Sequence, residues 1–257
     1  MLSIQDIHMS FGGLRAVDGC TFDVAAGSIT GLIGPNGAGK TTLFSIIAGF
    51  LKPTAGRVLL DGQDVTGQPS HRLFHRGLVR TFQIPHEFNG LTSLENLMTV
   101  PAGQDGERLF KAWFAPAAVA AREAEVMAEA DETLAFLGLD PVRNELAGNL
   151  SGGQKKLLEL GRAMMSGASV VLLDEPGAGI NPTLLGQLAE MIQRLNRERG
   201  ITFCIIEHNM DMIARLCDPV IVMAAGSVLT SGAMADIRKD PRVLEAYLGT
   251  AAAGDAA

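Results

Sequence analysis

The chain has 257 residues, of which 47% are hydrophobic and 19% are charged. This length and composition are typical of a globular protein with a buried core, and they exclude an intrinsically disordered chain. The formal net charge of −7 argues against a surface that coats nucleic acid. The first residues lack a signal peptide's basic start, and no segment approaches the roughly 20 apolar residues that span a bilayer. We therefore expect that another chain must carry this protein to any membrane at which it acts.

The first part of the chain predicts an antiparallel sheet beside a buried strand. Apolar and polar residues alternate through 2–24, and Gly12-Gly13 interrupts the alternation. Residues 57–60 form another strand pattern that ends in a tight Asp61-Gly62 turn. Residues 28–33 are short and apolar enough to be a strand that is buried on both faces.

The middle of the chain, from about residue 85 to 165, predicts a mainly helical insert. Apolar residues recur at helical spacing through 116–137, and Gly138 and Pro141 end the pattern. The single tryptophan, Trp113, is either a buried anchor of this insert or part of an exposed apolar patch. We favour the buried anchor.

Parallel-sheet patterns return after the insert. Residues 169–173 and 201–206 are apolar on both faces, as strands covered by helices are. Between them, 182–195 predicts an amphipathic helix that Asn181 caps. Further on, 220–223 and 227–229 predict a hairpin, and the tail after Gly249 is expected to be flexible.

Residues 34–41 match G-x-x-x-x-G-K-[ST], the pattern of a loop that wraps polyphosphate. The predicted strand before this loop and the helical pattern at 42–48 argue against a chance match. Backbone N–H groups and the helix N-terminus favour an anion there. Lys40 is expected to reach the β- and γ-phosphates, and the Thr41 hydroxyl to bind Mg²⁺. The predicted nucleotide-binding residues of this loop are Gly34, Pro35, Asn36, Gly37, Ala38, Gly39, Lys40, Thr41 and Thr42.

Charged and polar residues follow two of the predicted parallel strands. Residues 170–173 lead into Asp174 and Glu175, whose side chains point in opposite directions and can divide their work. Asp174 can hold Mg²⁺, while Glu175 can polarise a water molecule against the γ-phosphate. His208 follows the next strand, and the strand ends meet at one edge of a parallel sheet. His208 can therefore contact the γ-phosphate, the alternative being a purely structural histidine.

A second glycine-containing helix start lies in the insert. Ser151, Gly152, Gly153 and Gln154 combine capping-box spacing with two glycines that let a phosphate approach the helix N-terminus. One mononucleotide cannot readily touch both this site and the 34–41 loop in the same subunit. We therefore interpret the second site as one that serves the ATP of a partner subunit.

Over essentially its whole length the chain resembles the nucleotide-binding subunit of ATP-binding-cassette (ABC) transporters. Five motifs carry this resemblance, in the order in which they occur: 34–41, Gln83 within Arg80-Thr81-Phe82-Gln83, 150–154, Asp174-Glu175 and His208. The resemblance implies an α/β fold, a P-loop NTPase (RecA-like) parallel core with an N-terminal antiparallel β subdomain and a helical subdomain. The expected division is 1–84 for the first part of the ATP-binding core, 85–165 for the helical subdomain, 166–249 for the second part of the core and 250–257 for a flexible tail.

The same resemblance implies a head-to-tail dimer that binds two ATP molecules with Mg²⁺ between the subunits. It implies that Glu175 is the general base, that His208 contacts the γ-phosphate and that Gln83 contacts both Mg²⁺ and the coupling helix of a membrane subunit. Phe11 would stack on adenine, although an aromatic residue in a strand is more often part of the core. The metal-binding residues would be Thr41, Gln83 and Asp174.

Secondary matches resemble the larger ATPase subunit of branched-chain amino-acid importers. Among them are 79–83, 207–210 and the ending 246–249, while Asn181 replaces the aspartate that many cassettes have in the same loop. The implied partners are a second cassette (identical or related), two integral membrane permease subunits and, indirectly, a solute-binding protein, at the cytoplasmic face of the inner membrane. Urea and aromatic-acid importers and the lipopolysaccharide exporter are similar alternatives. A soluble ABC ATPase of DNA repair or translation is less favoured, because the chain is acidic and has one cassette without basic extensions.

Overall fold

The computed structural model describes residues 1–81, 87–104 and 113–254. Gln83 therefore lies outside the described residues. The chain divides into two compact units, each described by itself. The first consists of Met1–Gln83, Ser169–Ala178 and Leu185–Ala257, and the second of Ile84–Ala168 and Gly179–Leu184.

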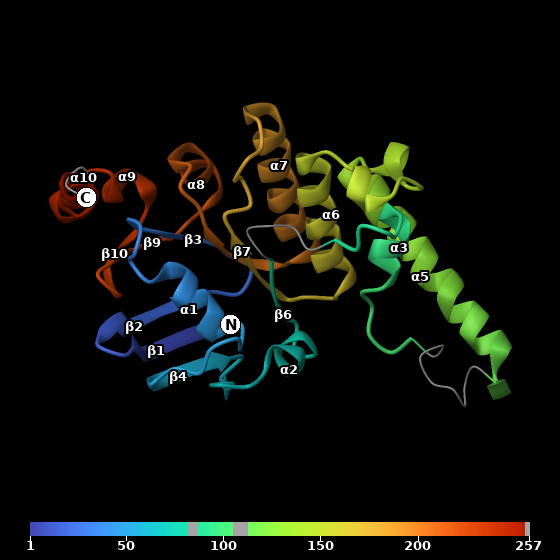
Figure 1. The fold of residues 1–257 in the computed structure, drawn as a ribbon, viewed down its shortest axis with the longest axis horizontal. Coiled ribbons are helices and arrows are strands. Elements are labelled where there is room, and N and C mark those ends of the chain that lie inside the picture. Colours follow the sequence, from blue (N-terminus) through green and yellow to red (C-terminus); the bar gives the residue numbers. More distant parts are fainter. Residues whose placement is uncertain (82–86, 105–112, 255–257) are drawn as a thin grey trace. The chain divides into compact units, whose positions relative to one another are not determined.

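A six-stranded sheet forms the centre of the first unit (Figure 1). Its strands, in spatial order, are β10 (Ser227–Gly232), β9 (Val220–Ala224), β3 (Ile29–Ile33), β8 (Thr202–Ile206), β7 (Val170–Asp174) and β6 (Leu78–Arg80). Neighbours from β9 to β6 pair in parallel, and β10 pairs antiparallel to β9. Every residue of β3, β7 and β8 is buried, which confirms the prediction that these apolar runs are covered on both faces.

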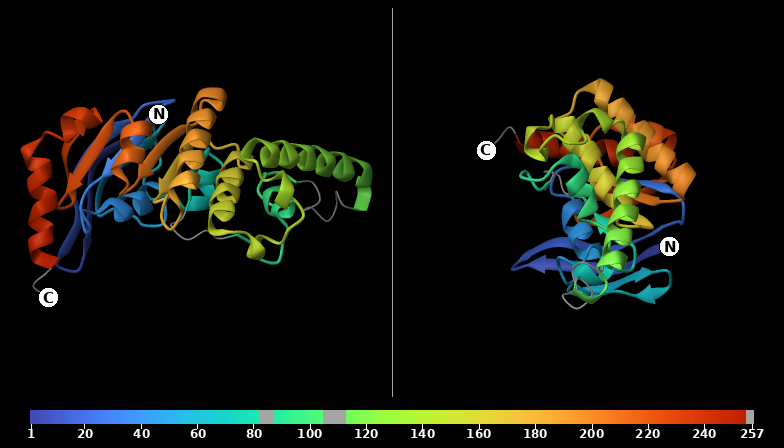
Figure 2. Two further views of the ribbon diagram at one scale, coloured as in Figure 1. Left: turned by 90° about the horizontal axis from the view of Figure 1, so that it is seen from above. Right: turned by 90° about the vertical axis from the view of Figure 1, so that its right-hand side faces the viewer.

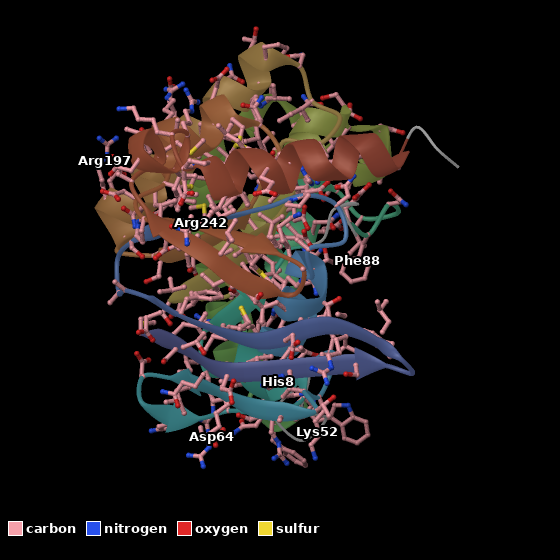
Figure 3. All side chains as sticks on the ribbon, turned by 90° about the vertical axis from the view of Figure 1, so that its left-hand side faces the viewer. His8, Lys52, Asp64, Phe88, Arg197 and Arg242 are labelled. Carbon is pink, nitrogen blue, oxygen red and sulfur yellow. The ribbon has the colours of Figure 1, made fainter. Side chains whose placement is uncertain are left out.

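The predicted antiparallel sheet is also present in this unit. Its order is β2 (Leu14–Val24), β1 (Leu2–Phe11), β4 (Ala55–Leu60) and β5 (Gln63–Asp64). Leu60 pairs with Gln63 across the expected tight turn. Figure 3 labels His8 of β1 and Asp64 of β5 on this sheet. Its apolar side chains, such as Ile4 and Ile7, share one core with Phe44 of α1 (Lys40–Ile47), and this core supports the phosphate loop.

The other helices of the first unit follow its strands. They are α2 (Ser70–Phe74), α7 (Pro182–Arg199, most of which lies in this unit), α8 (Met210–Leu216), α9 (Met234–Ile237) and α10 (Pro241–Gly254). The backbone of α10 remains helical beyond Gly249, where the flexible tail was expected to begin. Among the described helices, none combines the length and the apolar composition needed to cross a bilayer.

The second unit is helical, and Figure 2 shows its longest helix, α5, in green. Its elements are α3 (Ser93–Met98), α5 (Pro116–Leu137), the short 3₁₀ helices η2 (Asp140–Val142) and η3 (Ala147–Asn149), and α6 (Gly152–Met165). The bounds of α5 confirm the helix predicted from apolar spacing, and Gly138 ends it with a φ of 67°. Helices α3, α5 and α6 pack against one another through buried side chains such as Leu97, Leu134 and Leu158.

The prediction that Trp113 is a buried anchor is wrong, because the side chain is 81% exposed. Trp113 precedes Pro116, the first residue of α5, and the buried residues of that helix begin only at Val126. The beginning of α5 therefore offers no packed surface of its own in which the indole ring could be buried.

Candidate functional site

The phosphate loop connects β3 to α1 and depends on glycine at two close approaches. Gly39 has a φ of 94°, and a Cβ atom there would overlap the carbonyl oxygen of Ala16. A Cβ atom on Gly34 would likewise overlap the carbonyl oxygen of Met223. Only glycine fits these two positions without a backbone shift, so the loop's curvature follows from the motif itself.

Lys40 is held inside this loop. Its side chain is buried, and Nζ donates hydrogen bonds to the carbonyl oxygens of Gly34 (2.7 Å) and Pro35 (2.9 Å). Burial lowers the pKa of Lys40, while the negative charges of Glu175 and Asp174 act in the opposite direction. The ammonium group is thus fixed at the loop, close enough to both carboxylates for their charges to matter.

A pocket of about 340 Å³ lies against the loop in the first unit. It is lined by Phe11, Leu14, Arg15, Ala16, Asn36, Gly37, Ala38, Gly39, Lys40, Thr41, Thr42, Glu175 and His208. The structure therefore brings most of the predicted nucleotide-binding residues to one cavity with two of the three predicted catalytic side chains, Glu175 and His208. Phe11 is 48% exposed at the end of β1, so the alternative that it belongs to the core is wrong.

Glu175 and His208 face each other across the carboxyl ends of two neighbouring parallel strands. His208 Nε2 lies 3.1 Å from Glu175 Oε1. Asp174 of β7 pairs with Ile206 of β8, and the Glu175 amide donates to the Ile206 carbonyl at 2.9 Å. Glu175 has a φ of 50°, a left-handed conformation that non-glycine residues rarely adopt and that often occurs at functional sites. The expectation that these two strand ends meet at one edge is confirmed.

Asp174 makes a buried ion pair that the sequence analysis did not anticipate. Its Oδ2 lies 2.7 Å from Nη2 of Arg80, and Arg80 Nη1 donates to Ser45 Oγ at 2.8 Å. Both members of the pair have side chains less than a tenth exposed. Arg80 ends β6 beside β7, so a charged residue at the end of a short strand was the available signal.

The oxygen groups of Asp174 and Thr41 are of the type that Mg²⁺ prefers. Within residues 1–81, 87–104 and 113–254, no group of three or more His, Cys, Asp and Glu side chains is placed to hold a metal ion. Mg²⁺ itself retains several waters and is usually bound by one or two protein groups together with substrate phosphates.

The second predicted anion site has the expected local geometry in the second unit. Ser151 caps α6: its Oγ accepts from the Gln154 amide (3.4 Å), while Gln154 Oε1 accepts from the Ser151 amide (2.9 Å). The capping box predicted from spacing is confirmed. A Cβ atom on Gly153 would overlap Leu184, whereas a Cβ atom on Gly152 would meet no atom within 4 Å.

Asn181, which stands where many cassettes have an aspartate, caps a helix. Its Oδ1 accepts from the Leu184 amide at 2.9 Å and so caps the start of α7, as predicted. Gln83 was predicted to contact Mg²⁺ and a membrane subunit, and this role stays a prediction because the residue lies outside the described ranges.

Two models of known protein families match this sequence. A family model described as ABC transporter matches residues 17–178, and one described as branched-chain amino acid ATP-binding cassette transporter matches 227–253. The chain belongs to the ABC transporter ATP-binding family. It is an ABC ATPase, and its P-loop NTPase fold confirms the predicted fold class.

Similar proteins align with this ABC ATPase over nearly its whole length. The probable branched-chain amino acid transport ATP-binding protein LivG of Archaeoglobus fulgidus is 42% identical, covering 97% of this chain and 95% of its own. BraF of Pseudomonas aeruginosa, a high-affinity branched-chain amino acid transport ATP-binding protein, is 37% identical, covering 98% of both chains. The crystal structure of the ADP conformation of an ABC transporter cassette superposes with a TM-score of 0.82 at 36% identity, covering 97% and 98% of the two chains.

Proposed function

We propose that this ABC ATPase powers the uptake of branched-chain or closely related amino acids through separate membrane subunits. The proposal that the protein hydrolyses ATP rests on the Glu175–His208 pair, which lines the pocket beside the phosphate loop. The solute class is supported by the C-terminal family match at 227–253 and by the transport proteins that align along almost the entire chain.

ATP binds with its polyphosphate in the loop 34–42 and its adenine against Phe11. Lys40 exchanges its hydrogen bonds to loop carbonyls for bonds to the β- and γ-phosphates, which are stronger because both partners are charged. Glu175 orients a water molecule for in-line attack on the γ-phosphorus and accepts its proton, while His208 donates a hydrogen bond to the γ-phosphate. The bond between the γ-phosphorus and the β,γ-bridging oxygen breaks, and ADP is the leaving group. Catalysis in this arrangement rests mainly on positioning and charge stabilisation.

Mg²⁺ accompanies the nucleotide in this proposal. Thr41, Asp174 and Gln83 are the residues that would hold it, directly or through water. When bound, the ion would neutralise charge on the β- and γ-phosphates. Arg80 has a different role from the metal-binding residues, because its ion pair orients the Asp174 carboxylate before the nucleotide binds.

The complete ATPase is a dimer in which each nucleotide contacts the loop 34–42 of one subunit and Ser151, Gly152, Gly153 and Gln154 of the other. One chain carries both halves, so two identical copies or this chain and a related cassette can form the pair. Backbone N–H groups at the start of α6 and the Ser151 hydroxyl would bind the γ-phosphate of the partner's ATP.

The two permease subunits dock beside the Gln83 segment. A groove of about 260 Å³ in the first unit is lined by Phe50, Phe74, Val79, Arg80 and neighbouring residues, and Arg80 is three positions before Gln83 in the sequence. Its mainly apolar lining suits a short helix of a membrane protein. This docking holds the ATPase at the cytoplasmic face of the inner membrane, and a solute-binding protein contributes indirectly through the permeases.

The hydrolytic role is tested with Glu175→Gln. This variant keeps the shape of the side chain but cannot accept a proton, so we expect ATP binding and ATP-dependent dimerisation with turnover about 10²- to 10⁴-fold slower. Glu190→Gln is the matched control, because Glu190 pairs with Arg215 on the exposed side of α7. Near-normal turnover of Glu175→Gln refutes the role.

The transport role is tested separately by copurifying the membrane subunits and reconstituting them with this ATPase in liposomes. Stimulation of ATP hydrolysis by a branched-chain amino acid and its binding protein supports the proposal. Stimulation by urea alone, or copurification with lipopolysaccharide-export subunits, contradicts it.

A further inference from the structure

Glu207 is a buried carboxylate at the end of β8, only 4% exposed, beside the predicted catalytic residues. Its two oxygens accept three backbone hydrogen bonds. Oε1 accepts from the Gly177 amide at 2.6 Å, and Oε2 accepts from the amides of His208 (2.8 Å) and Asn209 (3.1 Å). One side chain therefore joins the loop that follows Glu175 to the loop that carries His208.

Further backbone hydrogen bonds attach the segment around Glu175 to the end of β8. The Glu175 amide is bound to the Ile206 carbonyl at 2.9 Å, and the Ala178 amide is bound to the Glu175 carbonyl at 3.1 Å. The Gly177–Glu207 bond fixes the segment between those two attachments. The side chains of Glu175 and His208, whose Oε1 and Nε2 atoms are 3.1 Å apart, thus belong to two backbone segments that Glu207 connects by hydrogen bonds.

Gly177 is matched to this carboxylate. A Cβ atom there would lie 2.6 Å from Glu207 Oε1 and 2.6 Å from Leu185 Cδ1, closer than real Cβ atoms come. Glu207 and Gly177 are therefore in close contact, and a residue larger than glycine at 177 would push the carboxylate aside.

We propose that Glu207 is a positioning residue for ATP hydrolysis, which sets the separation of Glu175 and His208 by holding both loops. This inference rests on the roles proposed above for those two residues. A carboxylate suits the task because both of its oxygens accept, so each can serve one loop. Glutamine offers one acceptor oxygen and one NH₂ donor, and so can satisfy only one of the two loops.

The test compares Glu207→Gln with the wild-type ATPase and with the control Glu190→Gln. We expect Glu207→Gln to lower kcat about 10- to 100-fold, since a misplacement of about 1 Å can cost that much. ATP affinity, measured by equilibrium binding, should change less than about two-fold, because Lys40 and its loop make no bond to Glu207. In the Glu175→Gln background, Glu207→Gln should add no further loss, because it acts through Glu175.

Gly177→Ala provides an independent disturbance of the same contact, should Glu207→Gln fail to fold by circular dichroism. We expect this variant to show the same loss of kcat with preserved ATP binding. Normal kcat in the folded variant, or equal losses of kcat and ATP affinity, overturns the proposal. If Glu175→Gln is slow while Glu207→Gln is normal, only the positioning role fails. If Glu175→Gln turns over normally, the assignment of the general base fails instead.

Discussion

The buried ion pair between Arg80 and Asp174 gives a prediction of stability whose size follows from its geometry. Replacing Arg80 with methionine keeps most of the side-chain volume but leaves the Asp174 carboxylate buried without its cation. Removing one partner of a buried pair costs about 3–5 kcal/mol. At about 2–4 °C per kcal/mol for a unit of this size, Tm should fall by about 6–20 °C.

Differential scanning calorimetry of the nucleotide-free protein measures this effect. The control is Arg122→Met, which removes an i,i+3 pair with the well-exposed Glu125 and should change stability by less than about 1 kcal/mol. Adding Asp174→Leu to Arg80→Met should recover most of the lost Tm, because no unpaired charge is then buried. A Tm within about 1 °C of wild type for Arg80→Met, or a double variant no more stable than the single one, refutes the reasoning.

Two further predictions concern the two halves of the nucleotide site. Lys40→Ala should weaken ATP binding about 10- to 100-fold, since charge-assisted hydrogen bonds contribute about 1.5–3 kcal/mol, and unchanged affinity in equilibrium binding contradicts the role of Lys40. Gly153→Ala should lose about 1–3 kcal/mol of unfolding free energy by forcing Leu184 aside. Gly152→Ala meets open space and is its matched control, so equal unfolding midpoints in urea for the two variants count against the packing argument.

Local signals in the sequence predicted much of this structure. The phosphate loop, the capping box at Ser151 and the helix Pro116–Leu137 depend on residues close together in the chain. Their geometry is set by glycine freedom, by a side chain three residues away and by helical spacing. The meeting of Glu175 with His208 was predictable because parallel strands end at one edge of a sheet.

Contacts between distant residues were not predictable in the same way. Strand β6 has three residues, too few for a periodic pattern, so the only signal at Arg80 was its charge, which does not identify Asp174 as its partner. The sequence analysis assigned no role to Glu207, although a charged residue directly after a fully buried strand was a signal of its own. The wrong prediction for Trp113 has another cause, because composition does not reveal that α5 has no fully buried residue before Val126.

The shared nucleotide site is the centre of this account, and a crystal structure of Glu175→Gln grown with ATP and Mg²⁺ tests it most directly. The account predicts a dimer in which Ser151 Oγ of each subunit lies within hydrogen-bonding distance of the γ-phosphate bound by the partner's loop 34–42. A structure in which ATP fills that loop while Ser151 faces solvent, away from the nucleotide of every neighbouring copy, contradicts it.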